Sequence, residues 1–203
     1  GHHAAFIEYL AEDAVLFRPE AVRGQEWLAT HEPAGGRLEW SPAASAAGCT
    51  ATLAVTTGPW RYSNSEGGEP VAGHYLSLWR LDAQSQWRVV LDHGVDHAGA
   101  VPAEQLQAAL AQFWPGARDE KCTGRGDLEG LVEADQRFNE QVARRGLLTA
   151  LQRTAREGAL IYRDDVVPGT LSGMQPAVDA AFGRGTVART VGTVFEPGTD
   201  LAV

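Results

Sequence analysis

Four long segments with the character of β-strands follow one another in the first half of the chain, separated only by short turns. They are rich in Val, Leu, Thr and Trp, and Gly, Pro, Ser and Asn gather between them. They span 37–47, 50–63, 71–82 and 87–97. Strands joined by short turns pair antiparallel, because a short turn reverses the chain direction. The sequence therefore predicts an antiparallel meander with helices packed on one face, an α+β fold.

Helical patterns precede and follow this run of strands. Phe6, Ile7, Leu10 and Ala14 recur at helical spacing before the first strand. The elements expected outside the meander are a helix at 4–14, a short strand at 15–19, a short helix at 24–31 and a connector helix at 102–114.

The second half of the chain repeats the order of elements in the first half. Val15 to Arg18 corresponds to Leu160 to Arg163, and each stretch follows a helix and precedes a turn. The tripeptide Leu53-Ala54-Val55 returns at the end of the chain as Leu201-Ala202-Val203. We therefore expect a first unit at 4–98 that lacks its leading helix, a connector at 99–127, and a truncated second unit at 128–203. Because a half-finished sheet exposes an unpaired edge, the chain is expected to be a fragment of a longer protein or to complete its second sheet with another chain.

Composition and charge exclude several classes of partner. The formal net charge is −9 and no basic run is present, which makes nucleic acid and anionic membranes poor partners. No apolar run is long enough to span a bilayer. Cys49 and Cys122 fit no metal-ligand spacing, and either free thiols or a disulfide remain open. The opening Gly1-His2-His3 resembles a tag remnant, so the compartment stays unassigned.

The last predicted strand carries the best candidates for chemistry. Regular alternation places Trp87, Val89, Leu91 and His93 on one face, which is apolar until its last member and should face the helices. His93 then lies at the end of an apolar wall, where it could act as a general acid/base, bind a ligand or be a structural histidine.

Asp92 follows on the opposite face if this strand is regular, as an interface, turn or catalytic residue. A bulge near Gly94 would redirect the Asp92 side chain inward. A metal site is not expected, since four residues of extended strand separate His93 and His97 by about 13 Å. We also expect no cofactor, because no phosphate-binding glycine loop or nucleophile motif is present.

Aromatic side chains could wall a pocket for a ring-shaped or acyl ligand, although ordinary core packing is the other interpretation. The candidate lining consists of Phe17, Trp27, Trp60, Tyr62, His74 and His93.

Several stretches together resemble the SnoaL-like branch of the nuclear-transport-factor-two-like (NTF2-like) superfamily. They are AFIEYLAEDAVLFRPEAVRGQEWL, TTGPWRY, GHYLSLWR and WRVVLDHGVDH. The resemblance implies a cone-shaped, cystatin-like α+β roll, repeated twice here, in which a curved antiparallel sheet wraps around helices and leaves a pocket. It also implies a dimer formed through the outer face of the sheet, either as a homo-oligomer or as a pseudo-dimer within one chain.

Three classes of function remain open, because the superfamily includes enzymes and noncatalytic domains. The first is a domain that binds a small apolar or carbonyl-bearing molecule in the pocket. The second is a cofactor-independent isomerase, lyase or polyketide cyclase in which His93, with Asp92 or Tyr62, moves a proton next to a carbonyl. The third is an oligomerisation module with a filled pocket.

Overall fold

The computed structural model describes residues 2–18, 20–31, 35–48, 50–113, 128–155 and 159–171. The expectations for Cys49, for Cys122 and for residues 172–203 lie outside these ranges. The described elements, in chain order, are α1 His2–Tyr9, β1 Leu10–Phe17, β2 Ala21–Arg23, α2 Gly24–Thr30, β3 Gly36–Trp40, β4 Ala44–Ala47, β5 Leu53–Asn64, β6 Val71–Leu81, β7 Trp87–Asp96, α3 Ala103–Phe113, α4 Leu128–Arg145, α5 Leu147–Thr154, β8 Leu160–Arg163 and β9 Val166–Thr170.

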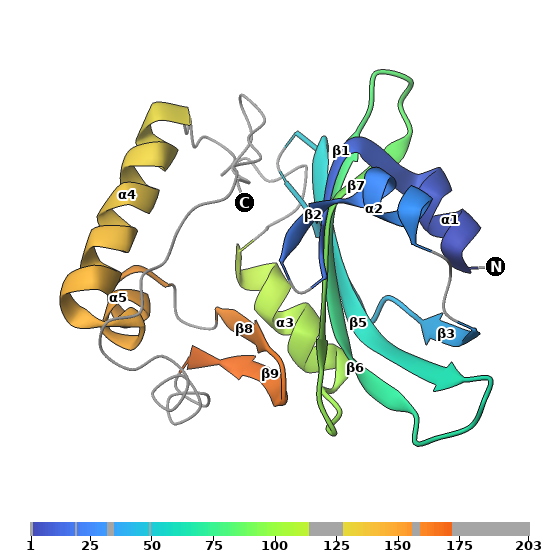
Figure 1. Ribbon diagram of the computed structural model, residues 1–203. Coiled ribbons are helices and arrows are strands. Elements are labelled where there is room, and N and C mark those ends of the chain that lie inside the picture. Colours follow the sequence, from blue (N-terminus) through green and yellow to red (C-terminus); the bar gives the residue numbers. More distant parts are fainter. Residues whose placement is uncertain are drawn as a thin grey trace.

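Seven strands form one mixed sheet, with the order β2-β1-β7-β6-β5-β3 and with β4 also paired to β5. The pairs among β3 to β7 are all antiparallel, as the short turns predict. Only β1 runs parallel to its neighbour β7, which a long connection between them permits. The predicted α+β architecture, a curved antiparallel sheet packed on helices, is therefore confirmed (Figure 1).

Helices cover both sides of this sheet, with α1 and α2 on one side and α3 on the other (Figure 1). The first hydrophobic core joins α2 and β1 to the sheet through residues such as Leu16, Leu28 and Val89. The second joins α3 to β4 and β5 through Leu106 and Val55. We call the side that faces α1 the pocket face and the side under α3 the outer face.

Two predicted elements differ from the structure. The helix expected at 4–14 ends at Tyr9, and Leu10 begins a strand, because pairing of β1 with β7 and β2 overrides the helical spacing. The strand expected at 37–47 is two strands, β3 and β4, because Pro42 has no N–H group to donate to the sheet.

Gly58 permits this break. A Cβ atom at Gly58 would lie only 2.0 Å from the carbonyl oxygen of Ser41, so the segment between β3 and β4 can cross β5 only where no side chain is present. Backbone hydrogen bonds from Ser41 to Pro59 and from Ala43 to Thr57 hold the crossing in place.

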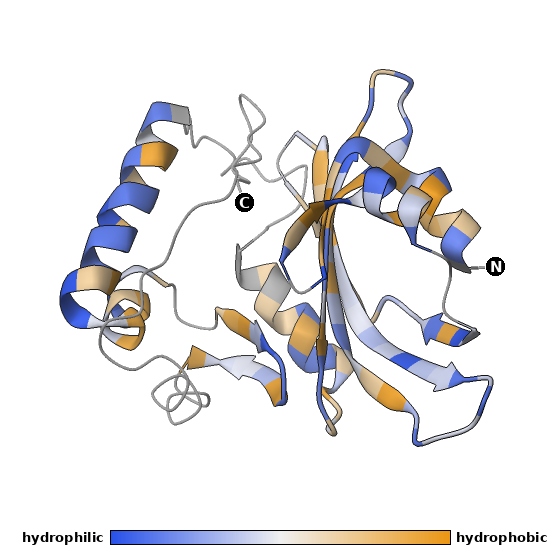
Figure 2. Cartoon of the chain, in the orientation of Figure 1, coloured by the Kyte–Doolittle hydropathy of each residue, from blue (hydrophilic) through white to orange (hydrophobic). Residues whose placement is uncertain are grey.

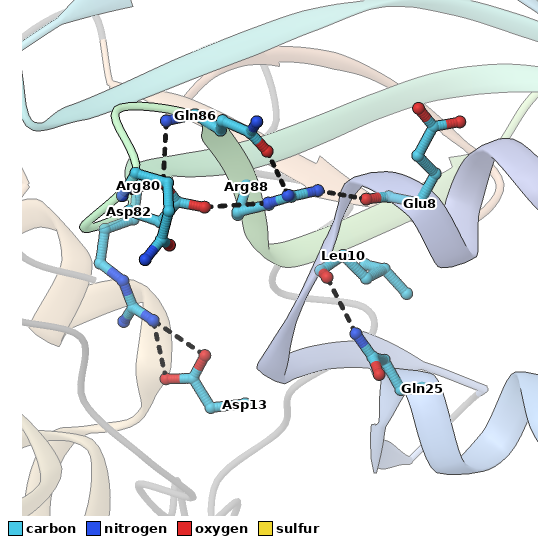
Figure 3. A network of polar contacts seen from close by, with 9 residues as sticks. Glu8, Leu10, Asp13, Gln25, Arg80, Asp82, Gln86 and Arg88 are labelled. Atoms are coloured by element: carbon cyan, nitrogen blue, oxygen red, sulfur yellow. Dashed lines mark hydrogen bonds and ion pairs between the residues drawn. The ribbon is translucent and has the colours of Figure 1, made fainter.

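A polar network fastens the end of α1 to the hairpin formed by β6 and β7 (Figure 3). Arg88 pairs with Asp82 at 3.1 Å and also donates to the carbonyl oxygen of Glu8 in α1. Backbone N–H groups of Gln84 and Gln86 donate to Asp82 and, with Arg88, lower the pKa of its carboxyl. The network fixes α1 over the sheet.

The described part of the second half consists of α4, α5 and the β8–β9 hairpin. The helix α4 is largely hydrophilic along its length (Figure 2). The hairpin packs against the first half, where the Tyr162 hydroxyl hydrogen-bonds to the Thr57 hydroxyl at 2.6 Å and Leu160 contacts the second hydrophobic core. The outer face is thus partly covered by segments of the same chain. The tandem repeat stays a prediction.

Candidate functional site

A pocket of about 580 Å³ lies between α1 and the pocket face of the sheet. Its walls are mostly apolar and aromatic. The lining residues are Ala5, Phe6, Tyr9, Leu10, Phe17, Arg18, Leu38, Trp40, Thr56, Trp60, Tyr75, Ser77, Trp79, Val89, Asp92, Gly94, Asp96 and Asp164.

Strand β6 supplies the centre of the pocket wall. Tyr75, Ser77 and Trp79 alternate along it, so all three project from the same face. The indole N–H of Trp79 donates to the Thr56 hydroxyl on β5 at 2.9 Å, which fixes the ring, and Tyr9 of α1 packs edge-on against it. Trp79 and Tyr75 thus both line the pocket.

A bulge in β7 decides which of its residues reach the pocket. Leu78 pairs with Leu91, while the next residue, Trp79, pairs with Val89, so that Val90 is an extra residue. Val89 and Asp92 therefore share the pocket face although they are three positions apart. The prediction that Val89, Leu91 and His93 share one face is wrong for this reason, and the bulge lies at Val90 rather than near Gly94.

Asp92 is the carboxyl group within the pocket wall. It pairs across the sheet with Ser77, whose hydroxyl donates to its Oδ1 at 2.5 Å. Burial raises the pKa of this carboxyl, while the Ser77 hydrogen bond and the nearby Arg18 and His93 partly oppose the rise. A carboxyl of this kind can accept a proton from a ligand or donate one to it.

Tyr75 adds a second polar group on the same wall. Its side chain is 8% exposed, and burial raises the pKa of its hydroxyl. A hydrogen bond with Thr56 opposes this rise, and the charge of Asp92 adds to it. The phenol thus stays protonated and can donate a hydrogen bond. In contrast, the indole nitrogen of Trp60 is buried and has no hydrogen-bond partner among the described residues.

His93 lies beside the pocket and not in its lining. Its cross-strand partner is Leu76, which places it on the outer face, and its ring packs edge-on against Phe17 with ring centroids 5.0 Å apart. Burial lowers the pKa of this imidazole, and Asp164 and Asp92 act in the opposite direction. His93 could therefore influence the pocket through Phe17 and Asp92, and its predicted role as acid/base stays a prediction.

The other candidates fall into two groups. Phe17 and Trp60 line the pocket. Trp27, Tyr62 and His74 lie outside the lining, each held by another contact. Trp27 stacks on His31 with centroids 4.2 Å apart, and the Tyr62 hydroxyl donates to the carbonyl oxygen of Gly35 at 2.8 Å. His74 belongs to the outer face, because it pairs with Pro59 and Val95, and hydrogen-bonds to His97 at 2.9 Å.

The exposed charged residues of the lining form what we call the polar mouth of the pocket, made of Arg18, Asp96 and Asp164. Asp164 comes from the turn between β8 and β9, in the second half of the chain. No local pattern in the sequence links it to β7. Ser77 was likewise missed, and only the register of β6 against β7 reveals its contact with Asp92.

Within the described ranges, no three His, Cys, Asp or Glu side chains come together in a way that could hold a metal ion. In the same ranges, no helix has the length and apolar character needed to cross a membrane.

Comparison with known proteins finds structural likenesses at low sequence identity. An NTF2-like protein of unknown function from Shewanella oneidensis matches at 17% identity and a TM-score of 0.38, over 45% of this chain and 81% of that one. A Δ5-3-ketosteroid isomerase from Mycobacterium sp. matches at 14% identity and a TM-score of 0.37, over 45% of this chain and 78% of that one. A ketosteroid isomerase-like protein from Erwinia carotovora atroseptica matches at 20% identity and a TM-score of 0.39, over 46% of this chain and 80% of that one.

The first of these proteins bears the family name that the sequence resemblance implied. No family model and no curated protein matches the chain. Because the TM-scores lie below 0.5, the likenesses carry no argument about ligand or reaction, and function rests on the pocket alone.

Proposed function

We propose that this chain binds a small, mostly apolar molecule bearing a carbonyl or similar oxygen in the pocket between α1 and the sheet. The observation that carries the proposal is a pocket of about 580 Å³ with aromatic walls and one enclosed carboxyl, Asp92. Pockets of this size, with few polar groups set in apolar walls, are typical of small-molecule sites.

Two polar groups of the pocket wall could bind an oxygen atom of the ligand. Asp92 and Tyr75 lie on neighbouring strands of the pocket face, and burial raises the pKa of both groups. A ligand oxygen that reached them would replace hydrogen bonds to water, whereas its apolar body would contact Phe6, Trp40 and Trp79.

A substitution that places a larger side chain in the pocket tests this proposal. A Cβ atom at Gly94 would lie 3.5 Å from the Trp60 indole nitrogen, an ordinary contact, so Gly94→Val should fold while its larger side chain occupies the pocket. The probe is prodan, a naphthyl ketone whose fluorescence shifts to the blue in apolar surroundings. We expect saturable prodan binding to the wild-type chain and binding at least about tenfold weaker in Gly94→Val.

Ala72→Val is the matched control, because Ala72 lies on β6 outside the pocket lining and is exposed. It should bind prodan as the wild type does. Absence of prodan binding to the wild type, or equal weakening in both variants, would contradict the proposed site.

A second candidate function is proton transfer at carbon next to a carbonyl. The observation that favours it is the raised pKa of Asp92, since a carboxylate of higher pKa is a stronger base. The Asp92 carboxylate would take the α-proton while the C–H electron pair moves toward the carbonyl oxygen, which Tyr75 would stabilise.

Hydrogen exchange tests this candidate without knowledge of the natural substrate. We expect the wild-type chain to speed the incorporation of deuterium into the methyl group of 2-acetylnaphthalene in D₂O, as followed by NMR, and Asp92→Asn to remove most of this acceleration. Displacement of prodan measures the binding of 2-acetylnaphthalene. If 2-acetylnaphthalene binds but its deuterium incorporation is not accelerated, the chain is a binding domain and the enzyme candidate is rejected.

A further inference from the structure

The hairpin of β8 and β9 completes the pocket of the first half. Strand β1 pairs with β7 only as far as Leu16 opposite Asp92, so the edge of β7 at Asp96 has no partner in β1. The turn of the hairpin fills this place. The N–H group of Asp165 donates to the carbonyl oxygen of Asp96 at 2.7 Å, and the N–H group of Asp96 donates to Oδ1 of Asp164 at 3.3 Å.

These bonds fix a carboxylate from the second half at the polar mouth. The Asp164 turn is anchored further along β8, where the Tyr162 hydroxyl meets the Thr57 hydroxyl on the outer face. Burial lowers the pKa of His93, which packs against Phe17 of the lining, and the charge of Asp164 opposes this lowering.

The charges of the polar mouth are unbalanced. Asp96 and Asp164 each contribute a carboxylate, and Arg18 contributes the one cation of the described lining. The Arg18 guanidinium is already engaged, because it donates to the carbonyl oxygen of Phe17 at 2.6 Å and lies 5.3 Å from the centre of the Trp27 ring. The mouth therefore repels anions and attracts cations.

Within the mouth, Asp96 lies farther along β7 than Asp92 does, whereas Arg18 is close enough to Asp92 to oppose the rise in its pKa. Asp92 and Asp96 lie four residues apart on one strand, which corresponds to about 13 Å. A ligand whose oxygen meets Asp92 would thus need an extended apolar body before its far end reached Asp164.

We propose that Asp164 is a specificity-determining residue of this pocket, which selects elongated apolar ligands with an ammonium group at the end that lies in the mouth. The inference rests on the proposed function and adds the charge of the ligand to it. A carboxylate at the mouth favours such a group by direct attraction and disfavours an acid by repulsion, so that both effects contribute to specificity.

Three dansyl amides that differ in the end group of their alkyl chain test the inference. Dansylcadaverine ends in an ammonium group, N-butyl dansylamide is neutral, and dansyl-6-aminohexanoic acid ends in a carboxylate. We expect the wild-type chain to bind them in this order of affinity, as measured by dansyl fluorescence, with the preference shrinking as salt is added.

Asp164→Asn removes the charge but keeps an oxygen that can accept the hydrogen bond from Asp96. It should reduce the ratio of ammonium to carboxylate affinity by about fivefold, the size of an exposed charge interaction, while binding of N-butyl dansylamide stays unchanged. Asp165→Asn is the matched control, because it makes the same change of charge one residue away, outside the lining, at a φ of 64° that asparagine tolerates.

The outcomes separate the inference from the proposed function. Failure of all three dansyl amides and of prodan to bind would overturn the proposed function. Two results would overturn the role of Asp164 without affecting the proposed function. One is that N-butyl dansylamide binds but the ammonium probe is not preferred, and the other is that Asp164→Asn and Asp165→Asn lose this preference equally. A larger loss in Asp164→Asn than in Asp165→Asn would support it.

Discussion

At the scale of single residues, the buried pair His74 and His97 has a protonation state fixed by its hydrogen bonds. The N–H group of Gly99 donates to Nδ1 of His97 at 3.2 Å, so that nitrogen carries no proton. The proton of His97 is then on Nε2, which donates to Nδ1 of His74 at 2.9 Å. The proton of His74 must lie on Nε2, which is buried without a hydrogen-bond partner among the described residues.

This arrangement makes stability depend on pH. Burial lowers the pKa of both imidazoles, and the charge of His97 lowers the pKa of His74 further, while Asp96 acts to raise the pKa of His97. Below a pH of about 6.5 the unfolded chain therefore takes up protons that the folded chain does not, and the free energy of unfolding falls by up to about 1.4 kcal/mol per pH unit for each such proton.

Denaturant unfolding between pH 7.5 and about pH 5 measures the effect. His74→Asn keeps an acceptor at the position of Nδ1 and removes one titrating ring, so its loss of stability with falling pH should be smaller than that of the wild type. Asp92 has the opposite effect on stability as the pH falls, because its raised pKa makes the folded chain bind a proton more readily than the unfolded chain does. This effect is the same in the wild type and in His74→Asn, so it cancels when the two are compared. His31→Asn, at an exposed ring outside the pair, is the control. Equal pH slopes in His74→Asn and the wild type would disprove this account.

At the scale of elements, the position of α1 decides whether a pocket exists. Its residues Ala5, Phe6 and Tyr9 form one wall, yet α1 is only 8 residues long, too short to be stable without packing. The Arg88 network holds its end to the β6–β7 hairpin (Figure 3). The strength of the wall therefore depends on a polar contact outside the pocket.

Removal of that contact should loosen the helix. We expect Arg88→Ala to lower the melting temperature by about 3 °C and to weaken prodan binding, because α1 loses its tie to the sheet. Arg37→Ala is the control, since Arg37 pairs with Glu39 on the surface and its side chain is 76% exposed. A melting temperature that drops in Arg88→Ala with prodan affinity unaltered would show that α1 is held by packing alone.

At the scale of the whole molecule, the two halves of the chain meet on both the outer face and the rim of one sheet. The connector helix α3 and the β8–β9 hairpin pack on the outer face, the surface through which the family resemblance implies a dimer. The same hairpin supplies Asp164 to the pocket. The described second half therefore covers part of the sheet of the first half within one chain, while the pseudo-dimer and the association with another chain both stay predictions.

The pairing of β5, β6 and β7 could be predicted from the sequence. Short turns between long strands impose antiparallel pairing locally, so the order β5-β6-β7 and the alternation of Tyr75, Ser77 and Trp79 follow from residues close together in the chain. The aromatic character of the pocket was visible in the same way, through Phe17 and Trp60.

The polar groups of the pocket could not be predicted from the sequence, because they depend on strand register and on contacts between distant segments. An extra residue at Val90 reverses the faces of β7, and whether a bulge forms depends on the register of two strands rather than on any residue type. Asp92 reaches the pocket in place of His93 for this reason. Asp164 reaches it because β1 leaves an edge of β7 unpaired, and backbone groups on an open edge bind whichever segment the fold brings to them.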